Sequence, residues 1–114
     1  MNGYYIEYSV GRARYVEENN SEKVILYSNY DYCRSSIALA KISQMLLNDD
    51  RYGGIVTKEE WDMGTMKYTI LRLNNDIITD ENDSVFRILA FHTPEQRDLF
   101  LKENIKLIKD YFML

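Results

Sequence analysis

Residues 86–114 read FRILAFHTPEQRDLFLKENIKLIKDYFML, a short apolar run followed by the most clearly specified helix of the chain. Thr93 is a favourable N-cap, Pro94 suits the first helical position, and Gln96 stands where a capping box requires it. Apolar residues then recur at steps of three and four residues, so one broad face of this helix must be buried. The pattern predicts a single helix over about 94–112 that packs on the strand 86–91 and on a second helix. The residues expected to be buried on its apolar face are Phe100, Leu101, Ile105, Ile108 and Phe112.

The second helix is predicted over about 35–48, where SSIALAKISQMLLN places Leu39, Ile42 and Leu46 at helical spacing. Asp31 or a nearby serine is the expected cap. The remaining segments are rich in aromatic and β-branched residues and are separated by polar turns, which is typical of antiparallel strands. The predicted strands are Tyr4–Tyr8, Arg12–Val16 in a hairpin with Lys23–Tyr27, Met66–Leu73, Ile77–Thr79 and Val85–Phe91.

These elements predict an α+β fold in a single domain, residues 1–114. A two-layer sandwich is the arrangement that best buries the apolar face of antiparallel strands against two amphipathic helices. We expect one antiparallel sheet of about five or six strands, with the helices at about 35–48 and 94–112 on the same face.

The chain has 114 residues and a net charge of −4, from 14 basic and 18 acidic side chains. A mildly acidic chain lacks the basic surface that binds duplex DNA. The single Cys33 cannot form a disulfide within the chain, and the first residues do not resemble a secretory leader, so we expect a cytoplasmic setting. No apolar stretch is long enough to suggest a membrane span.

The motifs that carry chemistry are all incomplete. His92 is the only histidine, and it would need a nearby nucleophile such as Cys33 and an orienting carboxylate to take part in catalysis. Asp80 begins a calcium-like loop whose sixth and twelfth positions lack the required glycine and glutamate. Glu59, Glu60 and Asp62 surround Trp61, but the spacing of the sequence places no second acidic motif that could pair with them in acid–base catalysis. The sequence therefore predicts no catalytic residue, no metal ligand and no cofactor, and the protein is expected not to be an enzyme. A small enzyme without a recognisable motif is kept as an alternative.

Tyrosine is the most unusual feature of the composition, with ten residues in the chain. Several of them fall on predicted strands in the same half as three arginines, and an aromatic sheet face with nearby guanidiniums can stack single-stranded bases. The alternative is that these tyrosines cover an open sheet face or form a protein interface. The candidate binding surface consists of Tyr5, Arg12, Arg14, Tyr15 and Trp61.

Four motifs in the second half occur in a familiar order: Trp61, the strand Lys67-Tyr68-Thr69-Ile70, the strand end Leu89-Ala90-Phe91, and the helix start Thr93-Pro94-Glu95-Gln96. Residues 61–114 thereby resemble small uncharacterised proteins carried by prophages and mobile elements of gut Bacteroidetes. The resemblance implies an accessory, phage-like origin and assigns no activity and no functional residue.

The leading hypothesis is a non-enzymatic protein that works by contacting another protein or by forming a homo-oligomer. The absence of a catalytic motif and the surplus of aromatic residues favour it, because protein interfaces are enriched in aromatic side chains. Binding of single-stranded nucleic acid through the Tyr/Arg sheet face is the second hypothesis.

Overall fold

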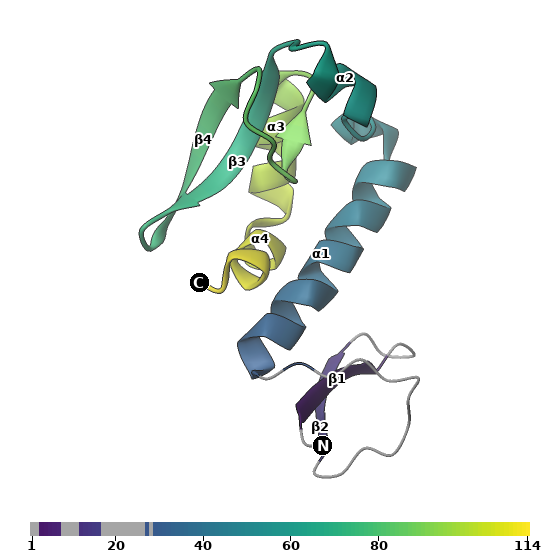
Figure 1. The fold of residues 1–114 in the computed structure, drawn as a ribbon, viewed down its shortest axis with the longest axis vertical. Helices are drawn as coiled ribbons and strands as arrows, with labels where there is room; N and C mark the ends of the chain where they lie inside the picture. The colour runs from purple at the N-terminus through teal and green to yellow at the C-terminus, as the bar shows by residue number, and fades with distance from the viewer. Residues whose placement is uncertain (1–2, 8–11, 17–26, 28) are drawn as a thin grey trace.

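The computed structural model describes residues 3–7, 12–16, 27 and 29–114. In these residues the chain forms two short strands, a long helix, two small helical turns, a three-stranded sheet and two further helices (Figure 1). The element bounds are β1 Gly3–Glu7, β2 Arg12–Val16, α1 Tyr30–Asn48, η1 Asp50–Tyr52, α2 Lys58–Asp62, β3 Lys67–Leu73, β4 Asp76–Asn82, β5 Ala90–Phe91, α3 Pro94–Glu103 and α4 Ile105–Phe112. The α+β fold class is confirmed.

The described strands form two separate antiparallel sheets, with the orders β1-β2 and β4-β3-β5. The expected single sheet of five or six strands is therefore not confirmed. Helix α1 has 19 residues and is about 28 Å long, and the β1–β2 ribbon lies at its N-terminal end while the larger sheet lies toward its other end (Figure 1). Among the described strands, none of the larger sheet pairs with a strand of the ribbon. Of the predicted hairpin partner Lys23–Tyr27, only Tyr27 is described, and it bridges Tyr4.

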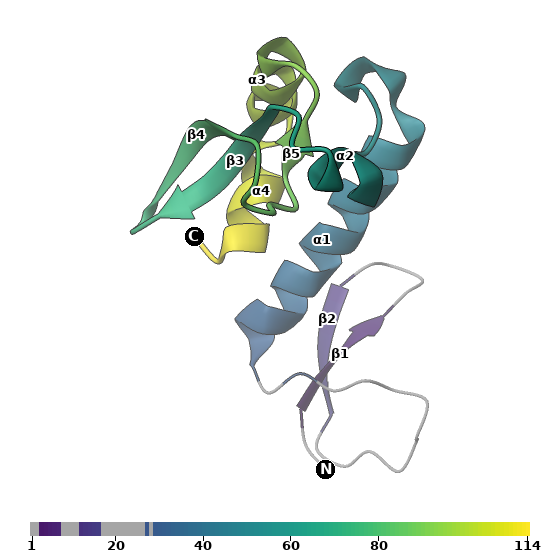
Figure 2. The same ribbon diagram turned by 45° about the horizontal axis from the view of Figure 1, so that its top comes forward.

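The helices do not share one sheet face in the way that a two-layer sandwich requires, and that arrangement is not confirmed either. Helix α3 packs against β3 and β5, whereas α1 packs along α4 and against the β1–β2 ribbon. Figure 2 shows α1 beside the sheet with α2 next to it.

Helix α1 also begins five residues earlier than predicted, because the side chain of Asn29 caps it by accepting from the Tyr32 N–H at 3.0 Å.

The C-terminal segment is two helices, so the prediction of one helix over 94–112 is wrong. Thr93 is the N-cap and accepts from the Gln96 N–H at 3.2 Å, as expected. Gln96 does not complete the capping box, since its Oε1 is buried without a partner among the described residues. The helix ends at Asn104, whose backbone has φ −129° and ψ 30°. The Asn104 amide donates to the Phe100 carbonyl and to the Tyr52 hydroxyl, both at 3.2 Å, which stabilises the break.

The predicted strand Val85–Phe91 shortens to Ala90–Phe91. The side chain of Asn82 accepts from the backbone N–H groups of Ser84 and Val85, which turns the chain away from β3 immediately after β4. Strand β4, by contrast, is longer than the three residues predicted and pairs with β3 along its full length. Residues 85–88 are exposed and form the approach to β5.

The core joins α1, η1, β3, β5, α3 and α4. Of the helix residues predicted to be buried, Phe100 and Ile108 are fully buried and Leu101 and Phe112 are half-buried, but Ile105 is 41% exposed. The break at Asn104 changes the helix direction and turns Ile105 out of the shared face. The fully enclosed cluster comprises Ile42, Leu46, Tyr52, Ile70, Leu89, Phe91, Phe100 and Ile108. No helix in the described part of the chain is long and apolar enough to cross a membrane.

Candidate functional site

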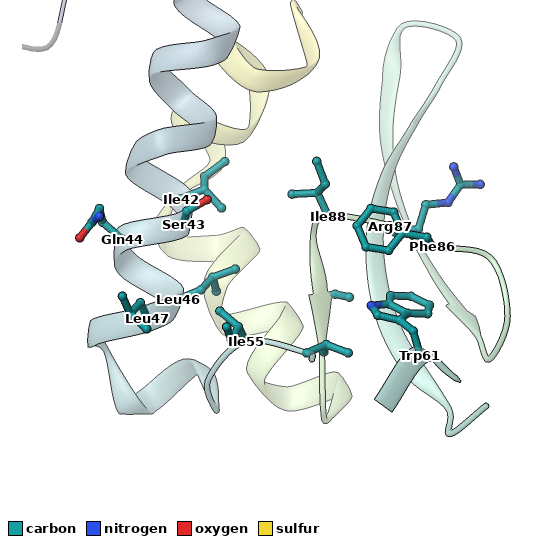
Figure 3. A pocket seen from close by; sticks show the side chains of 12 residues that line it. Ile42, Ser43, Gln44, Leu46, Leu47, Ile55, Trp61, Phe86, Arg87 and Ile88 are labelled. Atoms are coloured by element: carbon teal, nitrogen blue, oxygen red, sulfur yellow. The ribbon is translucent and has the colours of Figure 1, made fainter. Parts of the chain in front are cut away.

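An apolar groove of about 360 Å³ opens between the C-terminal half of α1 and residues 86–90, with Trp61 of α2 at one end (Figure 3). Ile42 and Leu46 belong to the α1 wall, and Phe86 and Trp61 lie together on the opposite side. The apolar residues that line the groove are Ile42, Leu46, Leu47, Ile55, Val56, Trp61, Phe86, Ile88 and Ala90, and the polar ones are Ser43, Gln44 and Arg87.

Four large apolar side chains around this groove remain in contact with solvent. Leu47, Ile55, Phe86 and Ile88 are between 42% and 65% exposed. Single exposed apolar residues are ordinary on a protein surface, but a contiguous group around one hollow marks a site of interaction. The groove is therefore the strongest candidate for a binding site in the described part of the chain.

The buried ammonium of Lys67 packs on the ring of Trp61, which forms one wall of the groove. The ammonium of Lys67 lies 4.4 Å from the centre of the Trp61 ring and donates to the Asp83 carbonyl at 3.2 Å. Lys67 is almost fully buried, so its charge is stabilised by the electron-rich face of the indole as well as by that hydrogen bond. The centre of the Phe86 ring lies 5.5 Å from the centre of the Trp61 ring. Trp61 is thus fixed in place, which gives the groove a preformed wall.

Helix α2 positions Trp61 through a capping box. The Thr57 hydroxyl accepts from the Glu60 N–H, and the Glu60 carboxylate accepts from the Thr57 N–H at 3.2 Å. The same carboxylate lies 2.6 Å from His92 Nε2, which ties α2 to the segment between β5 and α3. The hydrogen bond from the Thr57 backbone, together with the contact to His92, lowers the pKa of Glu60 below its ordinary value.

His92 and Cys33 do not come together. Cys33 is fully buried in the first turn of α1, where burial raises the pKa of its thiol, while His92 contacts α2 near the other end of α1 (Figure 1). His92 Nδ1 is buried without a hydrogen-bond partner among the described residues. Within those residues, no three histidine, cysteine or acidic side chains are grouped so that they could hold a metal ion.

The predicted binding surface divides into two places. Trp61 lines the groove, whereas Tyr5, Arg12 and Arg14 lie on the β1–β2 ribbon. Tyr5 pairs with Arg14 across the ribbon, and Glu7 forms ion pairs with Arg12 at 3.4 Å and with Arg14 at 3.3 Å. The backbone of Tyr15 pairs with Tyr4, and its side chain lies outside the described part. One carboxylate thus serves both arginines, which weakens the positive field that a nucleic-acid strand would need.

Sequence reasoning did not identify the groove residues other than Trp61. Two patterns in the sequence could have indicated part of the groove. Leu46 and Leu47 are adjacent in a helix that buries one face, so one of the two must face elsewhere. The spacing of Thr57 and Glu60 is that of a capping box and predicts the start of α2.

No protein-family model matches the chain, and neither does any curated protein or solved structure.

Proposed function

We propose that this protein is a non-enzymatic accessory protein that binds another protein through the groove between α1 and residues 86–90. The observation that carries the proposal is the group of exposed apolar side chains, Leu47, Ile55, Phe86 and Ile88, around one preformed hollow. Protein interfaces typically combine an apolar centre with a polar, solvent-accessible rim. The groove has this composition, with Ser43, Gln44 and Arg87 as its polar members.

The free energy gained by burying the four exposed apolar side chains indicates how strong the complex can be. Full burial of a large aliphatic or aromatic side chain contributes about 1.5–3 kcal/mol. Because the four side chains are already about half-buried, covering them adds roughly 3–6 kcal/mol in total, which association entropy offsets to a large extent. The groove alone therefore supports a weak complex, and a stable one needs polar contacts at the rim as well.

The resemblance of residues 61–114 to prophage and mobile-element proteins supports an accessory role. A cytoplasmic location is part of the same proposal, and the free, buried thiol of Cys33 agrees with a reducing compartment. Binding of single-stranded nucleic acid at the β1–β2 ribbon is less well supported, because Glu7 pairs with both arginines there.

The test uses three forms of the full chain: the wild type, Leu47→Lys in the groove, and Leu73→Lys as a matched control. Both leucines are more than half-exposed, and Leu73 is at the end of β3 and does not line the groove. Proteins captured from the native host are identified, purified and titrated against each form by calorimetry.

The proposal predicts that a purified partner binds the wild type and Leu73→Lys alike and that Leu47→Lys weakens binding at least tenfold. A partner that binds all three forms equally would show that the groove is not the binding site. Sedimentation of the protein alone separates self-association from binding of a different protein.

A further inference from the structure

Arg87 lies at the rim of the groove and has no ionic partner in the described part of the chain. Every other arginine of the chain forms an ion pair or a hydrogen bond, whereas Arg87 forms neither with the residues that the structure describes. Its side chain extends past Phe86 on the side away from α1 (Figure 3). An exposed guanidinium beside an apolar surface is suited to a carboxylate, which it can bind through two parallel hydrogen bonds. The rim therefore favours an acidic group on whatever occupies the groove.

The open edge of β5 is poorly prepared for an added strand. Because the Ile70 N–H donates to the Leu89 carbonyl at 3.0 Å, the backbone groups of Leu89 face β3 and those of Ala90 face the open side. The Ala90 N–H, which an added strand would need as a donor, already donates to the Ile88 carbonyl at 3.1 Å. An added strand would lack this donor, so a segment that satisfies its own backbone groups, as a helix does, is the better occupant.

The dimensions of the walls suit a short helical contact. Residues 42–47 of α1 rise by about 8 Å, and residues 86–90, which bend at Ile88 and Leu89, span less than the roughly 13 Å of an extended strand of that length. Apolar side chains at positions i, i+3 or i+4, and i+7 of an incoming helix span about 10 Å along its axis. Such a helix would lay its apolar face on Leu46, Leu47 and Ile88, and its polar flank would pass beyond Phe86, where Arg87 lies.

From these observations we infer that the groove binds an amphipathic helix of a different protein, with an acidic side chain on the flank of that helix paired with Arg87. The inference rests on the proposed function, since it names the partner of the same groove. A second copy of this chain is a poorer occupant. A symmetric groove-to-groove contact would place the two Arg87 side chains in one interface without a carboxylate for either.

The experiment selects binders to the full chain from a displayed library of 15-residue peptides. In half of the library the apolar residues are fixed at i, i+3, i+4 and i+7, and in the other half they alternate as in a strand; all other positions are random. Selections are repeated with Arg87→Glu. Arg87 and Leu47 are both exposed, so Arg87→Glu and Leu47→Lys should keep the thermal stability of the wild type, which is checked by circular dichroism.

The inference predicts helical-spacing binders of the wild type that carry Glu or Asp at one fixed flank position. Arg87→Glu should bind a selected acidic peptide at least tenfold more weakly and should regain affinity when that peptide residue is changed to Lys. Binding should be lost with Leu47→Lys and kept with Leu73→Lys.

Three results overturn the inference while leaving the proposed function intact: selection only of strand-patterned peptides, Leu47-dependent peptides with no charge preference at Arg87, or no peptide binder at all. The proposed function fails on a different result, namely a purified native partner that is indifferent to Leu47→Lys.

Discussion

Two isoleucines of α4 provide a matched test of the packing. Ile108 is fully buried in the cluster that joins α4 to α1, β3 and α3, and Ile105, three residues earlier, is 41% exposed. Replacement of Ile by Ala removes three carbon atoms, and at about 0.8 kcal/mol for each buried methylene the transfer loss at Ile108 is about 2.4 kcal/mol. The cavity that remains raises the cost of Ile108→Ala to about 3–4 kcal/mol.

At Ile105 the same change costs about 1 kcal/mol, because part of the side chain is already in water and alanine is the better helix former. Urea unfolding, followed by circular dichroism, measures both free energies. With a slope of about 1–3 kcal/mol per molar urea, Ile108→Ala should lower the midpoint by about 1–4 M and Ile105→Ala by about 1 M or less, with the ratio of the two shifts near three to four. Equal losses for the two variants would refute the break at Asn104 and the orientation of α4 that follows from it.

Three further predictions concern the turns and the two candidate surfaces. Gly53→Ala should lower the melting temperature more than Gly54→Ala, because both residues have positive φ (83° and 79°) but only at Gly53 would a Cβ overlap the Gln96 side chain. Acidification should destabilise the wild type more than Glu60→Gln. The folded-state pKa of Glu60 lies below its ordinary value of 4.5, so its stabilising effect is complete above that pH and is lost as the pH falls through the lowered pKa; melting curves from pH 3 to 7 check this. Oligonucleotides should not bind measurably at 150 mM salt, and salt-sensitive binding that is lost with Arg14→Ala would favour the nucleic-acid hypothesis instead.

Local signals in the sequence were sufficient for several elements. Thr93 and Pro94 predicted the start of α3 correctly, because an N-cap and a first-turn proline act within a few residues. The strand that became β3 and the turn after it were also predicted, and Asn74 has the positive φ, 57°, that such a turn requires.

The errors arose where distant residues decide the structure. The end of α3 at Asn104 depends on the hydroxyl of Tyr52, which lies 52 positions away in the chain. The apolar run FRILAF is consistent with a strand, but Asn82 turns the chain and leaves Phe86 to pack on Trp61. Periodicity cannot show that an apolar side chain stays exposed around a groove, so most of the candidate site was not predictable from the sequence.

The most direct test of the central claim is the fluorescence of Trp61 in the complex with a purified native partner. Trp61 is the only tryptophan of this chain and lines the groove, so a tryptophan-free form of the partner makes its emission a report on that surface. If the partner occupies the groove, binding should shift the emission to shorter wavelength and should reduce quenching by acrylamide, with the same midpoint as the calorimetric titration. An unchanged emission and unchanged quenching at saturating partner would contradict the claim that this groove is where the protein binds.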